Sequence, residues 1–203
     1  MTARFDINAV CKTYNFTRRR KALRNRYAKL HKDRVLLVGF GGTISSGYSP
    51  VTETIVPLFQ SQAVNTVSFI NSLGVNHVKF DNVGLVAKDS RDLTTDDMCE
   101  LLDLLHAAPN TNILITCGTY NLSRVAEVIA RVCTGLNKII GLTGSAMPAG
   151  YFATDAGANI LSTLSVMHYA KKHKTDGACA MFLVFHGKVY ETVDEFRAIN
   201  LFS

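Results

Sequence analysis

A threonine hydroxyl lies within three residues of the end of each of two apolar stretches of the chain. Thr43 follows the apolar run 34–40 through two glycines, and Thr119 follows the run 112–117 through one glycine. A hydroxyl attacks an amide or ester carbonyl when a neighbouring group accepts its proton, and glycine turns present N–H groups that stabilise the resulting oxyanion. The pattern therefore indicates acyl transfer, although Gly, Ser, Thr and Asp are also ordinary turn residues in any α/β protein.

Polar residues follow three further apolar runs in the same way. They lie at 88–92, in the loop from Thr143 to Asp155, and at 186–188. The carboxyl ends of parallel strands meet at one edge of a sheet, so these loops are expected to line one ligand site. The chain has neither G-x-x-x-x-G-K-[ST] nor G-x-G-x-x-G, which disfavours a nucleotide-phosphate loop there.

The elements that would hold these residues alternate along the chain. Apolar runs predict five strands, and helical periodicity predicts helices between them. The strands are expected at 34–40, 77–87, 112–117, 138–144 and 177–185, and the helices near 52–73, 95–107, 122–134 and 155–173. This alternation is typical of βαβ units and predicts an α/β fold with a doubly wound, mostly parallel five-stranded sheet flanked by helices. Thr94 and Asp97 have the spacing of a capping box and mark one helix start.

Positive charge is concentrated at the start of the chain. The net charge is +6 over 203 residues, and residues 1–34 hold 11 Lys and Arg against two Asp, a net of +9. The other 169 residues hold 11 Lys and Arg against 14 Asp and Glu, a net of −3. The sequence therefore predicts a basic N-terminal helical arm (1–34) followed by an α/β domain (35–203).

Within the arm, Phe16, Leu23, Tyr27 and Leu30 are spaced to form an apolar seam on a helix with basic faces. The seam can simply dock on the domain. Alternatively, the basic side chains contact nucleic acid or an acidic protein surface, since clustered cations neutralise phosphates. The residues concerned are Arg18, Arg19, Arg20, Lys21, Arg24 and Arg26. A targeting segment or membrane-surface helix is the third interpretation.

Composition disfavours several other classes. No apolar run reaches the roughly 20 residues that span a bilayer. Five scattered cysteines without paired spacing disfavour a disulfide framework or a zinc site, and favour the cytoplasm or another reducing compartment. No metal or cofactor is expected.

Five motifs in a fixed order carry a resemblance to a known family. They are GGTI at 41–44 with Tyr48, DS at 89–90 followed by LTTDD, ITCGT at 115–119, LTG at 142–144 with Pro148, and Asp155 with Asn159. Together they resemble the bacterial-type L-asparaginase family, and its short-chain members with the N-terminal α/β domain alone. The resemblance covers about residues 34–198.

The resemblance implies an amidohydrolase that releases ammonia through an acyl-enzyme and needs no cofactor. Thr43 would be the nucleophile, Tyr48 would help to activate it, and Thr119 would orient a second hydroxyl beside the scissile amide. Ser90 would hold a substrate carboxylate, with Tyr120 and Asn121 lining the substrate site. By analogy with the family, a homo-oligomer is expected.

The sequence departs from the family at critical positions. The family reads Thr-His-Gly-Thr-Asp-Thr where this chain has TCGTYN at 116–121, so Tyr120 replaces the aspartate that pairs with the substrate ammonium. A gapless count places Arg197 at the catalytic lysine, and arginine does not act as a base at neutral pH. His186 is expected to be structural, and Asp155 to cap the helix that follows it.

Three hypotheses remain. The first is an asparaginase-like amidohydrolase with an altered, weakened site and a small amide substrate that lacks a free α-amino group. The second is a catalytically inactive structural or interaction subunit whose basic arm binds nucleic acid or an acidic partner in a larger assembly. The third is a sensor that binds a small carboxylate or nucleotide at the same strand ends.

Overall fold

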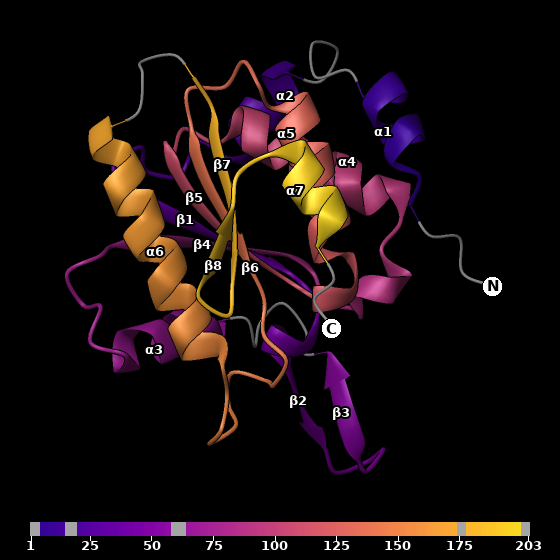
Figure 1. Cartoon of the computed structure of the whole chain (residues 1–203), viewed down its shortest axis with the longest axis vertical. Helices are drawn as coiled ribbons and strands as arrows, with labels where there is room; N and C mark the ends of the chain where they lie inside the picture. The colour runs from indigo at the N-terminus through magenta and orange to yellow at the C-terminus, as the bar shows by residue number, and fades with distance from the viewer. Residues whose placement is uncertain (1–4, 15–19, 58–63, 174–177, 200–203) are drawn as a thin grey trace.

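A central sheet with helices on both faces forms the body of the molecule (Figure 1). The computed structural model is described here for residues 5–14, 20–57, 64–173 and 178–199. The main sheet has the strand order β4-β1-β5-β6-β7-β8. Its strands are β1 (Val35–Phe40), β4 (Phe80–Val86), β5 (Asn112–Cys117), β6 (Ile139–Thr143), β7 (Ala180–Phe185) and β8 (Lys188–Tyr190).

The first five strands of this sheet pair in parallel, as the alternating pattern predicts. The short β8 pairs antiparallel with β7 and was not expected from the sequence. Strands β1 and β5 are buried at every position after the first, which matches their unbroken apolar sequence. Across the sheet, the parallel strands β4, β1, β5, β6 and β7 are the second, first, third, fourth and fifth of the chain. The chain passes from β1 to β4 on one side and then returns to add β5, β6 and β7 on the other side, so the direction of the connections reverses between β1 and β5. In doubly wound sheets this switch point is where ligands bind.

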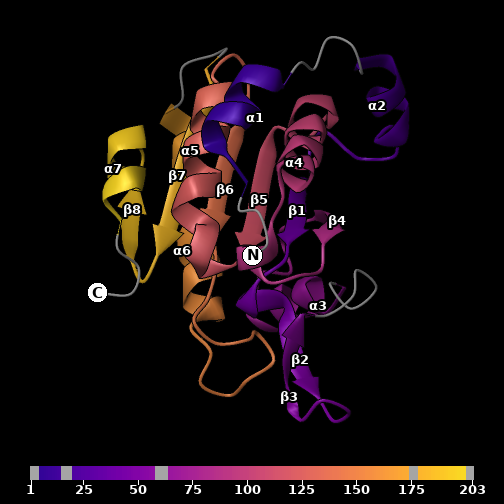
Figure 2. The ribbon, with the colours of Figure 1, turned by 90° about the vertical axis from the view of Figure 1, so that its right-hand side faces the viewer.

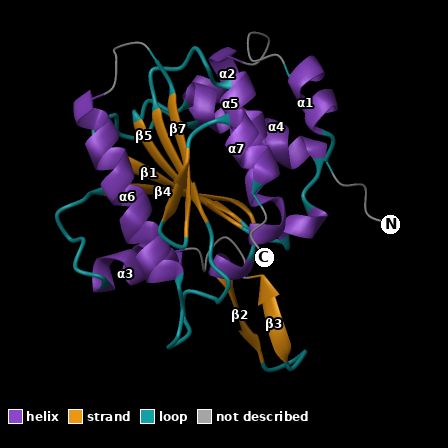
Figure 3. Cartoon of the chain, in the orientation of Figure 1, coloured by secondary structure: helices purple, strands orange, loops and turns teal. Residues whose placement is uncertain are grey.

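Two helical layers enclose the sheet (Figure 3). One face is covered by α4 (Thr95–Ala107), α5 (Leu122–Val132) and α7 (Val193–Ala198), and the other by α3 (Val64–Ser72) and α6 (Ala156–His173). The predicted capping box is present, because Thr94 Oγ1 accepts from the Asp97 N–H and the Asp97 carboxylate accepts from the Thr94 N–H. The two apolar clusters on either side of the sheet make up the core.

The helix expected near 52–73 is wrong in its first part. Residues 46–57 instead form a hairpin, β2 (Ser46–Ser49) and β3 (Thr54–Pro57), and only Val64–Ser72 is helical among the described residues of that span. Three β-branched residues, Thr54 to Val56, favour a strand, and Pro57 lacks the N–H that a helix interior needs. The hairpin projects from the body below the carboxyl ends of the strands (Figure 1).

The start of the chain packs into the core. Phe5 and Val10 are buried in the same cluster as Leu36, and α1 (Ile7–Thr13) lies against α4 and α5 (Figure 2). The guanidinium of Arg124 donates to the Phe5 carbonyl at 2.6 Å. Although the change in composition falls near residue 34, residues 5–14 therefore contribute to the core in space.

Helix α2 (Arg20–Arg26) lies beside α4. Tyr27 is buried, while Leu23 and Leu30 are partly buried against the same core, so these three seam positions dock as the first interpretation of the arm expects. Arg26 pairs with Glu100 of α4 at 2.9 Å. Phe16, Arg18 and Arg19 lie outside the described residues, and Arg20 and Lys21 form the first turn of α2.

None of the helices in the described ranges combines the length and hydropathy required to cross a bilayer.

Candidate active site

Two glycines after β1 bring the end of that strand against the end of β5. Gly41 and Gly42 have φ of 71° and 85°, in the left-handed region where a side chain is strained. A Cβ on Gly42 would lie 2.1 Å from the Cα of Gly118, so the two loops are in backbone contact. The Gly42 N–H also donates to the Lys88 carbonyl after β4 at 3.0 Å. Three strand ends thus converge at the switch point.

Thr43 begins a 3₁₀ turn (Thr43–Ser45) at this junction and is partly buried. The turn is held by the Ser46 hydroxyl, which donates to the Gly42 carbonyl at 3.0 Å. Tyr48 lies further along, in β2, with 60% of its surface exposed. No hydrogen bond in the described part of the chain links the Tyr48 hydroxyl to Thr43, so the two residues share a loop and hairpin but not a contact.

Ser90 is buried beside the glycine junction. It starts a 3₁₀ turn (Ser90–Asp92), and only 2% of its surface is exposed. A Cβ on Gly118 would lie 2.4 Å from Ser90 Oγ, so glycine at 118 leaves the space that this hydroxyl occupies. The Asn121 side-chain amide donates to the Ser90 carbonyl. Asn121 is fully buried and joins the turn after β4 to the turn after β5.

Thr119 opens the turn after β5 (Thr119–Asn121) and is partly buried. Its methyl group faces the end of β6, since a Cβ on Gly144 would lie 3.6 Å from Thr119 Cγ2. Tyr120, the next residue, is 37% exposed. Thr43, Ser90 and Thr119 therefore all lie at one edge of the sheet, on turns in mutual contact.

The thiol at the end of β5 is not a competing nucleophile. Cys117 ends β5 and is fully buried, and burial raises its pKa to about 12. A thiol with that pKa stays protonated at neutral pH, and the thiolate is the nucleophilic form. The described residues also contain no group of three His, Cys, Asp or Glu side chains that could hold a metal ion.

Comparison with known families identifies the family of the chain. The family model described as "Asparaginase, N-terminal" matches residues 34–196. The chain belongs to the asparaginase family. No curated protein sequence matches the chain.

Solved asparaginases share the fold. The thermostable L-asparaginase from Thermococcus kodakarensis superposes with a TM-score of 0.58 at 21% identity, over 77% of this chain and 45% of that protein. L-asparaginase I from Vibrio cholerae O1 biovar eltor gives the same four values. The probable cytoplasmic L-asparaginase from Campylobacter jejuni gives a TM-score of 0.53 at 16% identity, over 78% of this chain and 46% of that one. This asparaginase-family chain spans less than half the length of each of them.

Arg197 has other partners. It lies on α7, and its guanidinium binds Glu127 of α5 at 3.0 Å through Nε and 2.9 Å through Nη2. Asp194 lies 3.6 Å from the same side chain, and Arg131 also pairs with Glu127. Arg197 therefore joins an ion-pair cluster between α5 and α7, directed toward Glu127 and not toward Thr119.

The loop after β6 is held by Asp155, whose role differs from the expected one. Its carboxylate accepts from the backbone amides of Ala146 (3.0 Å) and Met147 (3.1 Å), nine and eight residues earlier. The N–H of Ala156, the first residue of α6, donates instead to Thr154 Oγ1 at 3.1 Å. A side chain satisfies whichever N–H groups are within reach, and the returning loop brings those of Ala146 and Met147 to Asp155.

His186 and Asn159 complete this network. The His186 ring and the Asn159 amide lie 3.0 Å and 2.9 Å from the Asp155 carboxylate, and Asn159 Oδ1 accepts from the His186 N–H. Burial opposes ionisation of Asp155, but its amide and imidazole partners outweigh burial and lower its pKa. His186 has φ of 48° and stacks on Phe185, as suits a structural turn residue. Sequence reasoning missed the network because its members come from three separate segments.

Proposed function

We propose that this asparaginase-family chain hydrolyses a small amide through a threonine nucleophile. The observation that carries the proposal is the contact between Gly42 and Gly118, which brings the turns of Thr43 and Thr119 together beside the buried Ser90. Membership of the asparaginase family and the place of these turns at the switch point support the same assignment.

In the proposed reaction Thr43 Oγ1 attacks the amide carbon, and its proton passes to the leaving nitrogen. Backbone N–H groups of these turns other than that of Gly42, which is bound to the Lys88 carbonyl, stabilise the oxyanion. Ammonia leaves an ester on Thr43, and water then cleaves the ester to release the acid and restore the hydroxyl. Tyr48 would assist the proton transfer, which requires the exposed hairpin side chain to turn toward Thr43.

The proposed substrate lacks a free α-ammonium group. Tyr120, a neutral phenol that is 37% exposed, occupies the position at which the family has an aspartate. Leaving a buried ammonium without its carboxylate costs about 2–5 kcal/mol. A loss of that size disfavours asparagine and favours an amide whose neutral or aromatic part faces Tyr120. Arg197 has no role as a base in this reaction, because its guanidinium is bound to Glu127.

Ammonia release tests this proposal. We expect release from succinamic acid, which is asparagine without its α-amino group, to exceed release from asparagine or glutamine. Thr43→Ala should lower the rate by about 10²–10⁴ or more, whereas Thr52→Ala, which removes an exposed threonine hydroxyl from the neighbouring hairpin loop, should not. Equal rates for Thr43→Ala and the parent protein contradict the nucleophile. A preference for asparagine contradicts the substrate class alone.

A second candidate function is that of a structural subunit whose basic arm (1–34) binds a polyanion. It is favoured by the docking of Leu23, Tyr27 and Leu30 on the core while Arg24, Lys29 and Lys32 stay exposed. Exposed cations in one segment bind phosphates by releasing counterions.

Charge neutralisation is the suitable test, because deleting residues 1–34 would remove the buried Phe5, Val10 and Tyr27 from the core. Replacing Arg24, Lys29 and Lys32 together by Gln should weaken binding to single-stranded RNA and reduce its salt slope by about 0.7 for each phosphate that is no longer neutralised. The matched control replaces Lys79, Lys171 and Lys172 by Gln. Equal weakening in both triple variants, or preference for an acidic peptide over RNA, contradicts this candidate.

A further inference from the structure

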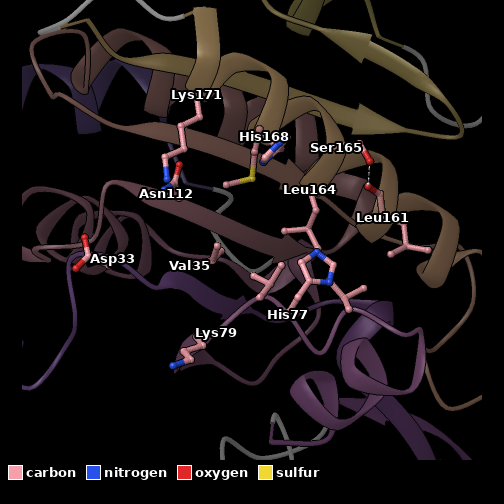
Figure 4. A pocket seen from close by; sticks show the side chains of 13 residues that line it. Asp33, Val35, His77, Lys79, Asn112, Leu161, Leu164, Ser165, His168 and Lys171 are labelled. Atoms are coloured by element: carbon pink, nitrogen blue, oxygen red, sulfur yellow. Dashed lines mark hydrogen bonds between the residues drawn. The ribbon is translucent and has the colours of Figure 1, made fainter.

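A cavity of about 660 Å³ lies at the opposite end of the sheet from the candidate active site (Figure 4). It includes Val35 and Asn112, the first residues of β1 and β5. Residues of α6 form one wall, and the segment before β4 forms another. Strands β1 and β5 have six residues each, so the two sites are separated by about 20 Å.

The floor of the cavity is apolar. Val75 and Met167 are buried, and Val35, Val78 and Leu164 are partly buried around them. These side chains come from both walls and from the sheet, so an apolar group entering the cavity would be enclosed from several sides. Each methylene group buried there contributes about 0.8 kcal/mol, the free energy of its transfer from water to an apolar environment.

The rim carries two lysines and two histidines. His77 and Lys79 come from the segment before β4, while His168 and Lys171 come from α6. All four are exposed, and within the described part of the chain none of them takes part in an ion pair. Figure 4 shows Lys171 extending from α6 toward Asn112. Among the described residues that line the cavity, Asp33 is the only acidic one.

We propose that this cavity binds a small molecule with a carboxylate group and an apolar tail. The tail lies on the floor formed by Val75, Leu164 and Met167, and the carboxylate binds at the rim beside Lys171. Known small-molecule sites have volumes of roughly 300–1,000 Å³ and join an apolar lining to a few oriented polar groups. The two lysines at the rim, Lys79 and Lys171, against the single carboxylate of Asp33, select an anionic head over a cationic one. This site is separate from the proposed reaction.

Octanoate is the probe. Octylammonium is the control, because it has an eight-carbon tail of the same kind and the opposite charge. Isothermal titration at neutral pH should give one saturable octanoate site with Kd of roughly 0.1–1 mM, the range expected for a ligand of this size. Lys171→Glu should weaken octanoate binding by about fivefold or more, since it removes one ion pair and adds a repulsion. Lys172→Glu, the same change one residue along α6 and outside the lining, should leave Kd unchanged.

Several results would overturn the proposal. They are the absence of saturable octanoate binding, equal binding of octylammonium, and equal weakening by the variants of Lys171 and Lys172. Sedimentation velocity tests whether a second copy of the chain occupies the cavity instead. A dimer that persists in octanoate and is abolished by Lys171→Glu would assign the cavity to that second copy. Thermal melting of both variants confirms that they are folded before titration.

Discussion

The two ends of β1 and β5 are built differently. At the carboxyl end the strands run into turns in backbone contact, where Gly42 meets Gly118. At the amino end Val35 and Asn112 border a cavity of about 660 Å³. Polar side chains hold that amino end: Asp81 of β4 binds the segment before β1, and Lys138, just before β6, binds carbonyls of the segment before β5.

The difference concerns how each end is held in place. Close backbone packing distinguishes the carboxyl end, because the approach of Gly42 to Gly118 leaves no room for a Cβ. Buried charges and their hydrogen bonds fix the amino end. Substitutions that add volume should therefore act mainly on the first end, and changes of charge or pH mainly on the second. Four predictions test this contrast.

The largest effect is expected for Gly42→Ala. The new Cβ would lie 2.1 Å from the Gly118 Cα, at a residue with φ of 85°, and we expect a loss of about 3–5 kcal/mol in unfolding free energy. Urea denaturation measures it. Gly74→Ala has φ of 82° but open space around the Cβ and should lose only about 1–2 kcal/mol. Gly135→Ala, with neither feature, should stay within about 0.5 kcal/mol. Equal losses at Gly42 and Gly74 would refute the steric explanation.

An intermediate effect is expected for Asp81→Asn. The Asp81 carboxylate accepts from the His31 backbone N–H, from Arg34 Nη1 at 3.3 Å and from Asn110 Nδ2 at 3.1 Å. The amide should cost about 2–3 kcal/mol, since the group is buried and one oxygen is replaced by a donor. Asp33→Asn, an exposed neighbour, is the control.

The same carboxylate predicts a pH dependence. Burial raises the pKa of Asp81, but hydrogen bonds from His31 and Asn110 outweigh burial, so its pKa lies below the ordinary 3.8. Its contribution to stability is therefore complete above pH 3.8 and is lost as the pH falls through the folded-state pKa. Urea titrations of the parent protein and Asp81→Asn should converge at low pH, and a constant gap would contradict this.

The smallest effect per pH unit is expected from Lys138. Its ammonium donates to the carbonyls of Ala108 (2.8 Å) and Asn110 (2.7 Å), and burial lowers its pKa from 10.5 to about 8. Between these values the unfolded chain binds more protons, so stability should rise with pH, by at most about 1.4 kcal/mol per pH unit. The slope for the parent protein should exceed that for Lys138→Met between pH 8 and 10.5. Parallel curves would show that Lys138 does not titrate in this window.

The parallel sheet was predictable from the sequence, because the unbroken apolar runs of β1 and β5 and the capping box at Thr94 are local signals. The hairpin was not. The span 46–57 carries Tyr48, Val51 and Ile55 at spacings that also suit a helix, and the exposure of these three side chains gives no buried face to identify the strands. Helix α1 has seven residues, too few turns for a periodic pattern.

For the candidate site, the order of the motifs predicted which strand end each residue follows, and Thr43, Ser90 and Thr119 do lie at one edge. Contacts between distant segments could not be predicted. The pairing of Arg197 with Glu127 depends on how α7 crosses α5, and the bonds from Asp155 to Ala146 and Met147 depend on the path of a loop. Neither has a local sequence pattern.

The burial of Phe5 against α5 has a consequence for synthesis of the chain. The Phe5 carbonyl bonds to Arg124, and Tyr14 bonds to Asp103, so the first segment finds its partners only after about a hundred further residues have been made. At about 5–20 residues per second the interval is on the order of 10 s. During it residues 5–14, which include the apolar Phe5 and Val10, have no core partners to pack against. Residues 5–14 are thus made well before the partners that cover them.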